Sequence, residues 1–83
     1  HGSAPTIAGK DKANPTAMFL SAAMMLDWLA NRHSSQSLQT ASKLINCAVE
    51  EGFRSSRTQP YEFGGPHGFQ EHAETILHIV DEL

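Results

Sequence analysis

The stretch HGSAPTIAGKDKANP (residues 1–15) runs directly into TAMFLSAAMMLDWLA (residues 16–30), and this transition organises the chain. The first stretch holds two glycines, two prolines and several small polar residues, a composition typical of a loop. The second is almost wholly apolar. The residue before a proline avoids the helical region, and proline itself suits the first helical position. We therefore expect Asn14 to cap a helix that begins at Pro15.

The predicted first helix, about residues 15–30, is apolar on every face. Between Ala17 and Leu29 only Ser21 and Asp27 are polar. Such a helix is normally buried all round, so its methionines are expected to pack in a core rather than to bind metal. Two further short helices cannot cover it. We therefore expect the chain to need a further protein surface, and we interpret it as a C-terminal piece of a longer protein.

Two amphipathic helices are predicted downstream. A serine among residues 34–37 caps the second helix, and Gly52 is expected to end it. The connector over residues 53–68 allows one short edge strand around residues 56–63. The last helix is expected to begin near Gly68 or Phe69, with an apolar face formed by Phe69, Ala73, Ile76, Val80 and Leu83. The predicted fold is mostly α, one incomplete domain with a loop (residues 1–14) and a helical part (residues 15–83).

Composition argues against several classes of protein. The net charge is −3, and the six lysines and arginines are scattered, so nucleic-acid binding is not expected. The sequence lacks a run of eighteen apolar residues, so a membrane-spanning helix is not expected. The single cysteine, Cys47, suits a reducing compartment. We expect a cytoplasmic protein, or one of the mitochondrial matrix in a eukaryote.

The histidines of the last third raise the question of a metal site. His67, His72 and His78 are separated by five and six residues, so one helix face cannot carry all three. No pair of cysteines accompanies them. The spacing therefore argues against a zinc site.

Four short motifs carry a more specific signal: HGSAP (residues 1–5), IAGK (residues 7–10), ANPTA (residues 13–17) and LSAAMML (residues 20–26). Together they resemble the coenzyme-binding loop and the next helix of the isocitrate/isopropylmalate dehydrogenase family, which includes tartrate and homoisocitrate dehydrogenases. The resemblance is dense over the first thirty residues or so and weaker, but collinear, to the end.

The resemblance implies that the longer protein is an α/β enzyme and a homodimer. It would use NAD or NADP and a divalent metal, Mg²⁺ or Mn²⁺. Its reaction would oxidise and decarboxylate a malate-type 2-hydroxy acid such as isopropylmalate, isocitrate or tartrate. In this family the loop wraps the adenosine half of the coenzyme.

The same resemblance implies roles for individual residues. His1 would lie against the adenine, and Ile7 would pack beside it. The backbone of residues 2–5 would approach the ribose and phosphates, and Asn14 would hydrogen-bond an adenine edge. The set of coenzyme-binding residues implied in this way is His1, Gly2, Ser3, Ala4, Pro5, Thr6, Ile7 and Asn14.

Thr6 departs from the family pattern. NAD-preferring members have an aspartate there, which reads the ribose hydroxyls and repels the extra phosphate of NADP. NADP-preferring bacterial isocitrate dehydrogenases have Lys-Tyr in place of Thr6-Ile7, followed later by a Tyr and an Arg. Tyr61 matches that Tyr, but Gly65 stands in place of the Arg. Because most NADP-type groups are missing, NAD is the expected coenzyme and NADP the alternative.

The catalytic groups of the family have no counterpart in this chain. The reaction needs a metal that polarises the hydroxyl, a general base and a general acid. No residue here matches the family's acidic metal ligands, lysine, tyrosine or substrate-binding arginines. We therefore expect no catalytic residue and no metal ligand in this segment, which alone would be inactive.

One alternative stays open on the sequence. The chain would then be a stand-alone helical interaction module without catalysis, using the apolar first helix to bind a partner. Circular dichroism separates the two interpretations. A cooperative, monomeric melt of the isolated chain would favour the module, and a molten or aggregating chain would favour the fragment.

Overall fold

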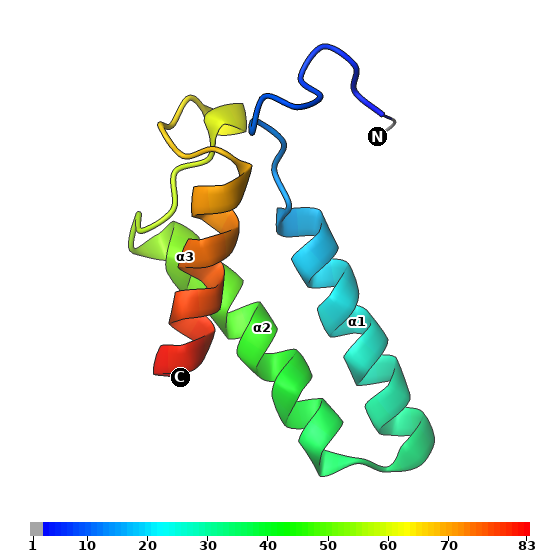
Figure 1. The fold of residues 1–83 in the computed structure, drawn as a ribbon. Coiled ribbons are helices and arrows are strands. Elements are labelled where there is room, and N and C mark those ends of the chain that lie inside the picture. Colours follow the sequence, from blue (N-terminus) through cyan, green and yellow to red (C-terminus); the bar gives the residue numbers. More distant parts are fainter. Residues whose placement is uncertain (1–2) are drawn as a thin grey trace.

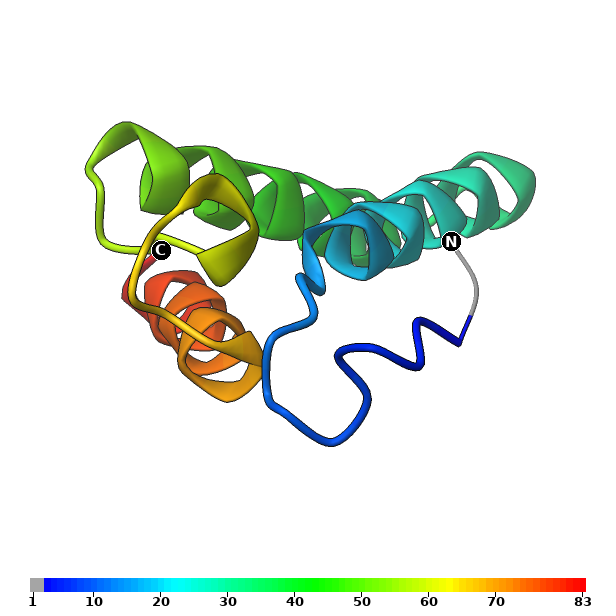
Figure 2. The ribbon, with the colours of Figure 1, turned by 90° about the horizontal axis from the view of Figure 1, so that it is seen from above.

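The computed structural model describes residues 3–83 and contains three helices. These are α1 (Thr16–His33), α2 (Gln36–Arg54) and α3 (Phe69–Glu82), with a short 3₁₀ helix, η1 (Tyr61–Phe63), before the last. α1 and α2 form an antiparallel hairpin, and α3 packs against α2 (Figure 1). Seen from above, the N-terminal loop curves away from the three helices (Figure 2). The prediction of a loop followed by three helices is confirmed.

Residues 56–63 do not form the short edge strand that the sequence allows. Across residues 3–83, β-pairing is limited to an isolated bridge between Pro60 and His67. The N–H of Tyr61 donates to the carbonyl of His67 at 2.8 Å, and the N–H of His67 donates to the carbonyl of Gln59 at 3.0 Å. Because η1 begins directly after Pro60, the chain turns before a strand can extend.

α1 begins one residue later than expected. Pro15, rather than Asn14, is the residue that precedes the helix. Asn14 nevertheless supplies the capping group, since its Oδ1 accepts the N–H of Thr16 at 3.0 Å. The helix also continues three residues past the expected end at Ala30. It stops at Ser34, whose left-handed backbone (φ 50°) turns the chain toward α2.

The prediction that Gly52 ends the second helix is wrong, since α2 continues to Arg54. Its start agrees with the sequence, because Ser35 caps the helix by accepting the N–H of Leu38 at 3.4 Å. Gly52 is buried in the last turns of α2. A Cβ at this position would lie 3.0 Å from Cδ1 of Ile76 and 3.2 Å from Cγ2 of Thr58. Close packing against α3, and not helix termination, explains the glycine.

The core lies between α2 and α3. It consists of Ala48, Val49, Ile76 and Ile79, with Phe19, Phe53 and Val80 packed against it.

The apolar face predicted for α3 is wrong at its two ends. Phe69 and Leu83 are exposed, whereas His72, Ile76 and Ile79 are buried. These three residues follow the same 4-3 spacing on a neighbouring stripe. A pattern based on apolar residues misses this stripe because it contains a histidine.

α1 contacts α2 through small residues. Ala23 and Ala30, seven residues apart on one stripe, are its buried positions. The hydroxyl of Ser42 on α2 donates to the carbonyl of Ala23 at 2.7 Å, which requires a close approach of the two helices. Within this segment the expected burial of the methionines is not found: Met18 is 73% exposed and Met24 is 72% exposed.

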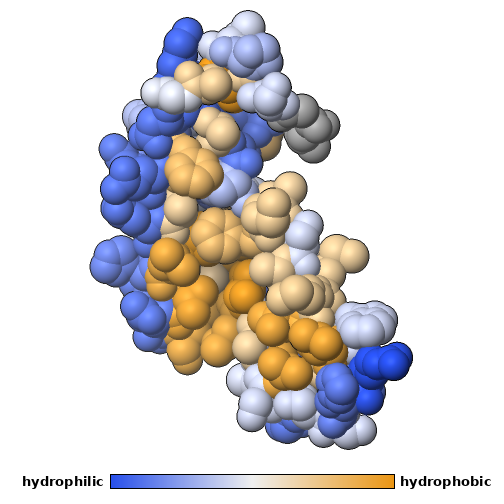
Figure 3. Space-filling model, turned by 45° about the vertical axis from the view of Figure 1, so that its right-hand side comes forward, coloured by the Kyte–Doolittle hydropathy of each residue, from blue (hydrophilic) through white to orange (hydrophobic). Residues whose placement is uncertain are grey.

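The exposed large apolar side chains of α1 lie on the arc opposite Ala23 and Ala30, about half of the helix circumference. They are Met18, Leu20, Met24, Met25 and Trp28. Figure 3 shows one face of the molecule on which apolar side chains gather below the N-terminal loop, flanked by hydrophilic ones. The expectation that the other two helices leave α1 partly uncovered is confirmed.

Candidate functional site

The N-terminal loop is built from two successive turns. The N–H of Ile7 donates to the carbonyl of Ala4 at 3.0 Å, and the N–H of Lys10 donates to the carbonyl of Ile7 at 3.1 Å. Gly9 turns the chain with a φ of 73°. The side chains of residues 3–6 are exposed, and Ile7 is half-buried. His1 and Gly2, two of the predicted coenzyme contacts, lie outside the described residues.

Asp11 fixes the end of this loop to α3. Its backbone carbonyl accepts the N–H of Phe69 at 2.9 Å, and its Oδ1 accepts the N–H of Gln70 at 2.9 Å. These are two of the N–H groups that a helix start leaves without partners, and a carboxylate there is also favoured by the helix dipole. A Cβ on Gly68 would overlap the backbone oxygen of Asp11, so the contact depends on glycine.

Sequence reasoning did not identify Asp11. A signal did exist, because Gly68 precedes the last helix and supplies no side-chain acceptor for the first N–H groups. The missing cap left room for an acceptor from elsewhere in the chain, where water would otherwise serve.

A second set of contacts joins the loop to η1. Nζ of Lys12 lies 4.6 Å from the centre of the Tyr61 ring, a cation–π arrangement. Nδ2 of Asn14 donates to Oε2 of Glu62 at 2.9 Å. The structure thus brings Tyr61, which the family resemblance links to coenzyme choice, against the same end of the loop as Asn14.

His72 forms a buried polar connection between α3 and the start of α1. Its side chain is fully buried. Oγ1 of Thr16 lies 2.7 Å from Nε2, and the hydroxyl of Thr58 contacts Nδ1. The Thr16 hydroxyl also donates to Oδ1 of Asn14 at 2.6 Å, so it must accept a hydrogen from Nε2 of His72. Nδ1 then accepts from Thr58, which assigns the neutral imidazole with its proton on Nε2.

The charge state of His72 agrees with this arrangement. Burial lowers its pKa below the ordinary value of 6.5, and the nearby His67 lowers it further. The ring of Phe53 lies 5.7 Å from that of His72 and contributes to the apolar surroundings. A neutral imidazole has one donor and one acceptor, which are the two functions that Thr16 and Thr58 require.

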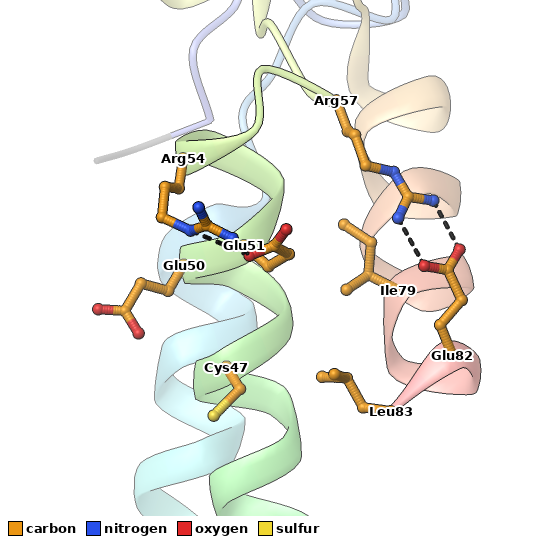
Figure 4. Close-up of a pocket in the computed structure, with 8 residues that line it drawn as sticks. All are labelled: Cys47, Glu50, Glu51, Arg54, Arg57, Ile79, Glu82 and Leu83. Atoms are coloured by element: carbon orange, nitrogen blue, oxygen red, sulfur yellow. Dashed lines mark hydrogen bonds and ion pairs between the residues drawn. The ribbon is translucent and has the colours of Figure 1, made fainter.

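A separate hollow of about 590 Å³ lies between the C-terminal ends of α2 and α3 (Figure 4). Its arginines are paired with acids. Arg57 binds Glu82 through two hydrogen bonds of 2.6 and 2.7 Å, and Arg54 binds Glu51. The bonds from Arg57 lower the pKa of Glu82. Each guanidinium thus faces a carboxylate of this chain, which offsets its charge. Its lining is Cys47, Glu50, Glu51, Arg54, Arg57, Ile79, Glu82 and Leu83.

Histidine, cysteine and acidic side chains are the candidate metal ligands of this chain. Among residues 3–83, no group of three or more of them is arranged to hold a metal ion. Of the helices that the structure describes, none is long and apolar enough to cross a lipid bilayer.

Comparison with known proteins gives the assignment. Residues 1–76 match the family model described as isocitrate/isopropylmalate dehydrogenase. The chain belongs to this family. The resemblance seen in the opening motifs is therefore confirmed, and the match extends well beyond the loop. The coenzyme roles of Ser3, Ala4, Pro5, Thr6, Ile7 and Asn14 stay predictions.

Named relatives of the dehydrogenase family agree with this assignment. The chain is 39% identical over 83 residues to an isocitrate/homoisocitrate dehydrogenase of Thermus thermophilus, covering all of this chain and 22% of the relative. It is 49% identical over 55 residues to a 3-isopropylmalate dehydrogenase of Thermosynechococcus vestitus, 66% of this chain and 15% of the relative.

A further relative is a 3-isopropylmalate dehydrogenase of Synechocystis, 42% identical over an alignment of 89 positions that covers all of this chain and 22% of the relative. The dehydrogenase chain thus spans about a fifth of the length of these relatives. No solved structure shows a significant match to it.

Proposed function

We propose that this chain is the part of a β-decarboxylating dehydrogenase that lines the adenosine half of an NAD(P) site. The observation that carries the proposal is the double attachment of the family's loop. Asp11 holds the loop to the start of α3, and Asn14 holds it to Glu62 of η1. A loop fixed in this way is preorganised, so it loses less conformational entropy when a ligand binds.

The exposed and half-buried groups of the loop suit a nucleoside. Residues 3–6 expose small polar and apolar side chains that allow close approach of a ribose and a phosphate. Asn14 presents an amide that can hydrogen-bond a base. The coenzyme, when bound, accepts a hydride from the substrate. This chain's residues would hold its adenosine end and so orient it.

Thr6 favours neither coenzyme by charge, and we propose NAD because Lys-Tyr and the later Arg of the NADP-type enzymes are absent. One relative, a mitochondrial regulatory protein of Dictyostelium discoideum, is named as part of an isocitrate dehydrogenase that uses NAD, which is consistent with this choice.

The divalent metal, Mg²⁺ or Mn²⁺, does not fit the residues described here, since residues 3–83 hold no suitable cluster of ligands. We assign metal binding and the acid and base of the reaction to other parts of the longer protein. The substrate would be a malate-type 2-hydroxy acid such as isopropylmalate, isocitrate or tartrate.

We also propose that this segment packs against the rest of the longer chain. The longer protein would form a homodimer. The exposed arc of α1 is an apolar surface on a helix that small residues attach to α2. Burying it against the remainder of the dehydrogenase would remove Met18, Met24 and Trp28 from water. Nucleic acid and membrane are not among the partners we propose.

The coenzyme proposal is tested in the intact dehydrogenase by comparing kcat/KM for NAD and NADP. We expect a preference for NAD, and a hundredfold preference for NADP would contradict the choice. Thr6→Asp should lower kcat/KM for NADP by about tenfold or more, because a carboxylate repels the 2′-phosphate. Thr40→Asp, an exposed threonine on α2, is the matched control and should leave the ratio unchanged.

A further inference from the structure

The amide of Asn14 can be built in two orientations that differ by exchange of oxygen and nitrogen. Its neighbours decide between them. One side of the amide faces two donors, the N–H of Thr16 at 3.0 Å and the hydroxyl of Thr16 at 2.6 Å. The other side faces the carboxylate of Glu62 at 2.9 Å, which only accepts. The oxygen therefore points toward Thr16 and the NH₂ group away from it.

The hydroxyl of Thr16 has one hydrogen, and it donates this hydrogen to Asn14 while the nitrogen on its other side carries a hydrogen of its own. That nitrogen is Nε2 of the buried His72, at 2.7 Å. If Nε2 lacked its hydrogen, the Thr16 hydroxyl would turn to donate to the imidazole and would no longer donate to Asn14. In the observed arrangement Nε2 carries the hydrogen, and the hydroxyl of Thr58 then donates to Nδ1. Hydrogen-bond direction thus runs from α3 to the end of the loop.

We propose that Thr16 and His72 are positioning residues for the coenzyme, holding the carbonyl of Asn14 inward so that its NH₂ group faces the base as a donor. The inference rests on the proposed function of the loop. It also specifies the contact. One hydrogen of Nδ2 goes to Glu62, and the second has no partner among residues 3–83. A donor recognises the ring nitrogens of adenine, which accept, and not the exocyclic amino group, which donates.

A purely structural role is the competing explanation, since the same contacts join α1 to α3. Substitutions that remove a buried hydrogen bond would then lower stability without a selective effect on the coenzyme. A positioning role predicts a change in the constants for the coenzyme but not in KM for the hydroxy acid. It also predicts that a substitution that keeps the hydroxyl restores coenzyme binding.

The test uses the intact dehydrogenase, with Kd for NADH measured by fluorescence and KM for NAD measured separately from KM for the hydroxy acid. Thr16→Val should raise the coenzyme constants about five- to tenfold, the value of one hydrogen bond, and leave KM for the hydroxy acid unchanged. Thr16→Ser should restore them to within about twofold of the parent. Thr75→Val, which removes a hydroxyl bonded only to the Glu71 carbonyl of its own helix, is the control.

A second pair of variants, at His72, tests the same inference if the Thr16→Val protein does not fold. His72→Gln retains an N–H that can donate to Thr16, whereas His72→Leu removes it. We expect weaker coenzyme binding for His72→Leu than for His72→Gln. Equal constants for the two variants, or a Thr16→Val enzyme with unchanged coenzyme affinity, would overturn the inference.

The Asn14→Ala variant distinguishes a failure of the positioning role from a failure of the proposed coenzyme-binding function. If Asn14→Ala weakens NADH binding but Thr16→Val does not, the loop binds the coenzyme and only the positioning role is wrong. If Asn14→Ala has no effect on NADH binding, the assigned contact of the loop is itself wrong.

Discussion

α1 and α3 pack against the same helix in different ways. α3 inserts Ile76 and Ile79, both essentially unexposed, into the core with α2. α1 buries Ala23 and Ala30 and packs the half-buried Phe19 against the core, while most of its large side chains, among them Met24 and Trp28, remain exposed. The amphipathic α3 buries its apolar face within this segment, whereas α1, which is apolar all round, can bury only one of its faces here. The core of this segment is therefore complete on the α3 side of α2 and open on the α1 side.

The largest effect on stability is expected from a substitution in the core between α2 and α3. Ile76→Ala should destabilise the intact dehydrogenase by about 2–5 kcal/mol, since it removes buried methyl groups and leaves a cavity. Thermal or denaturant unfolding measures the change. The neighbouring Leu77 is more than half exposed, so Leu77→Ala serves as the control. Similar losses for the two variants would mean that α3 is buried on more than one face.

A substitution on the exposed apolar face of α1 should have different effects in the isolated chain and in the intact enzyme. Met24→Ser should reduce self-association of the isolated chain, because the side chain is exposed there. In the intact dehydrogenase the same change should cost about 1.5–3 kcal/mol, the value of burying a methionine. Analytical ultracentrifugation and thermal unfolding measure the two effects. An unchanged melting temperature in the intact enzyme would argue against the proposed burial of α1.

The smallest effect concerns pH. The pKa of His72 is lower in the folded protein than its unfolded value of 6.5, chiefly because of burial. As the pH falls below 6.5, the unfolded chain binds a proton that the folded chain excludes, so stability decreases with acidification. Melting temperatures between about pH 5 and 7.5 should show this loss in the parent protein.

His72→Leu provides the control for the pH profile, since it removes the titrating group and leaves His67 in place. The difference between the two profiles isolates His72. A melting temperature for the parent protein that rises on acidification, relative to the variant, would contradict the sign.

The parts of the fold that could be predicted from the sequence are those that local patterns determine. The 4-3 apolar spacing and the serine cap located the three helices, and the motifs of the first thirty residues identified the family. The prediction for Gly52 fails because a glycine that ends a helix and one that admits a neighbouring helix look alike in sequence. His72 is polar and falls outside an apolar pattern, although two threonines from other segments satisfy its ring. Such contacts depend on tertiary packing, which periodicity does not report.

The bond between Asp11 and Gln70 has a topological consequence. It joins residues 59 positions apart, so everything between them forms a closed ring of chain. The entropy cost of closing such a ring rises slowly, by roughly 0.6 kcal/mol for each doubling of its length. The turn between α1 and α2 lies far from this junction (Figure 1). Insertions at that turn can therefore lengthen the hairpin while the loop keeps its hold on α3.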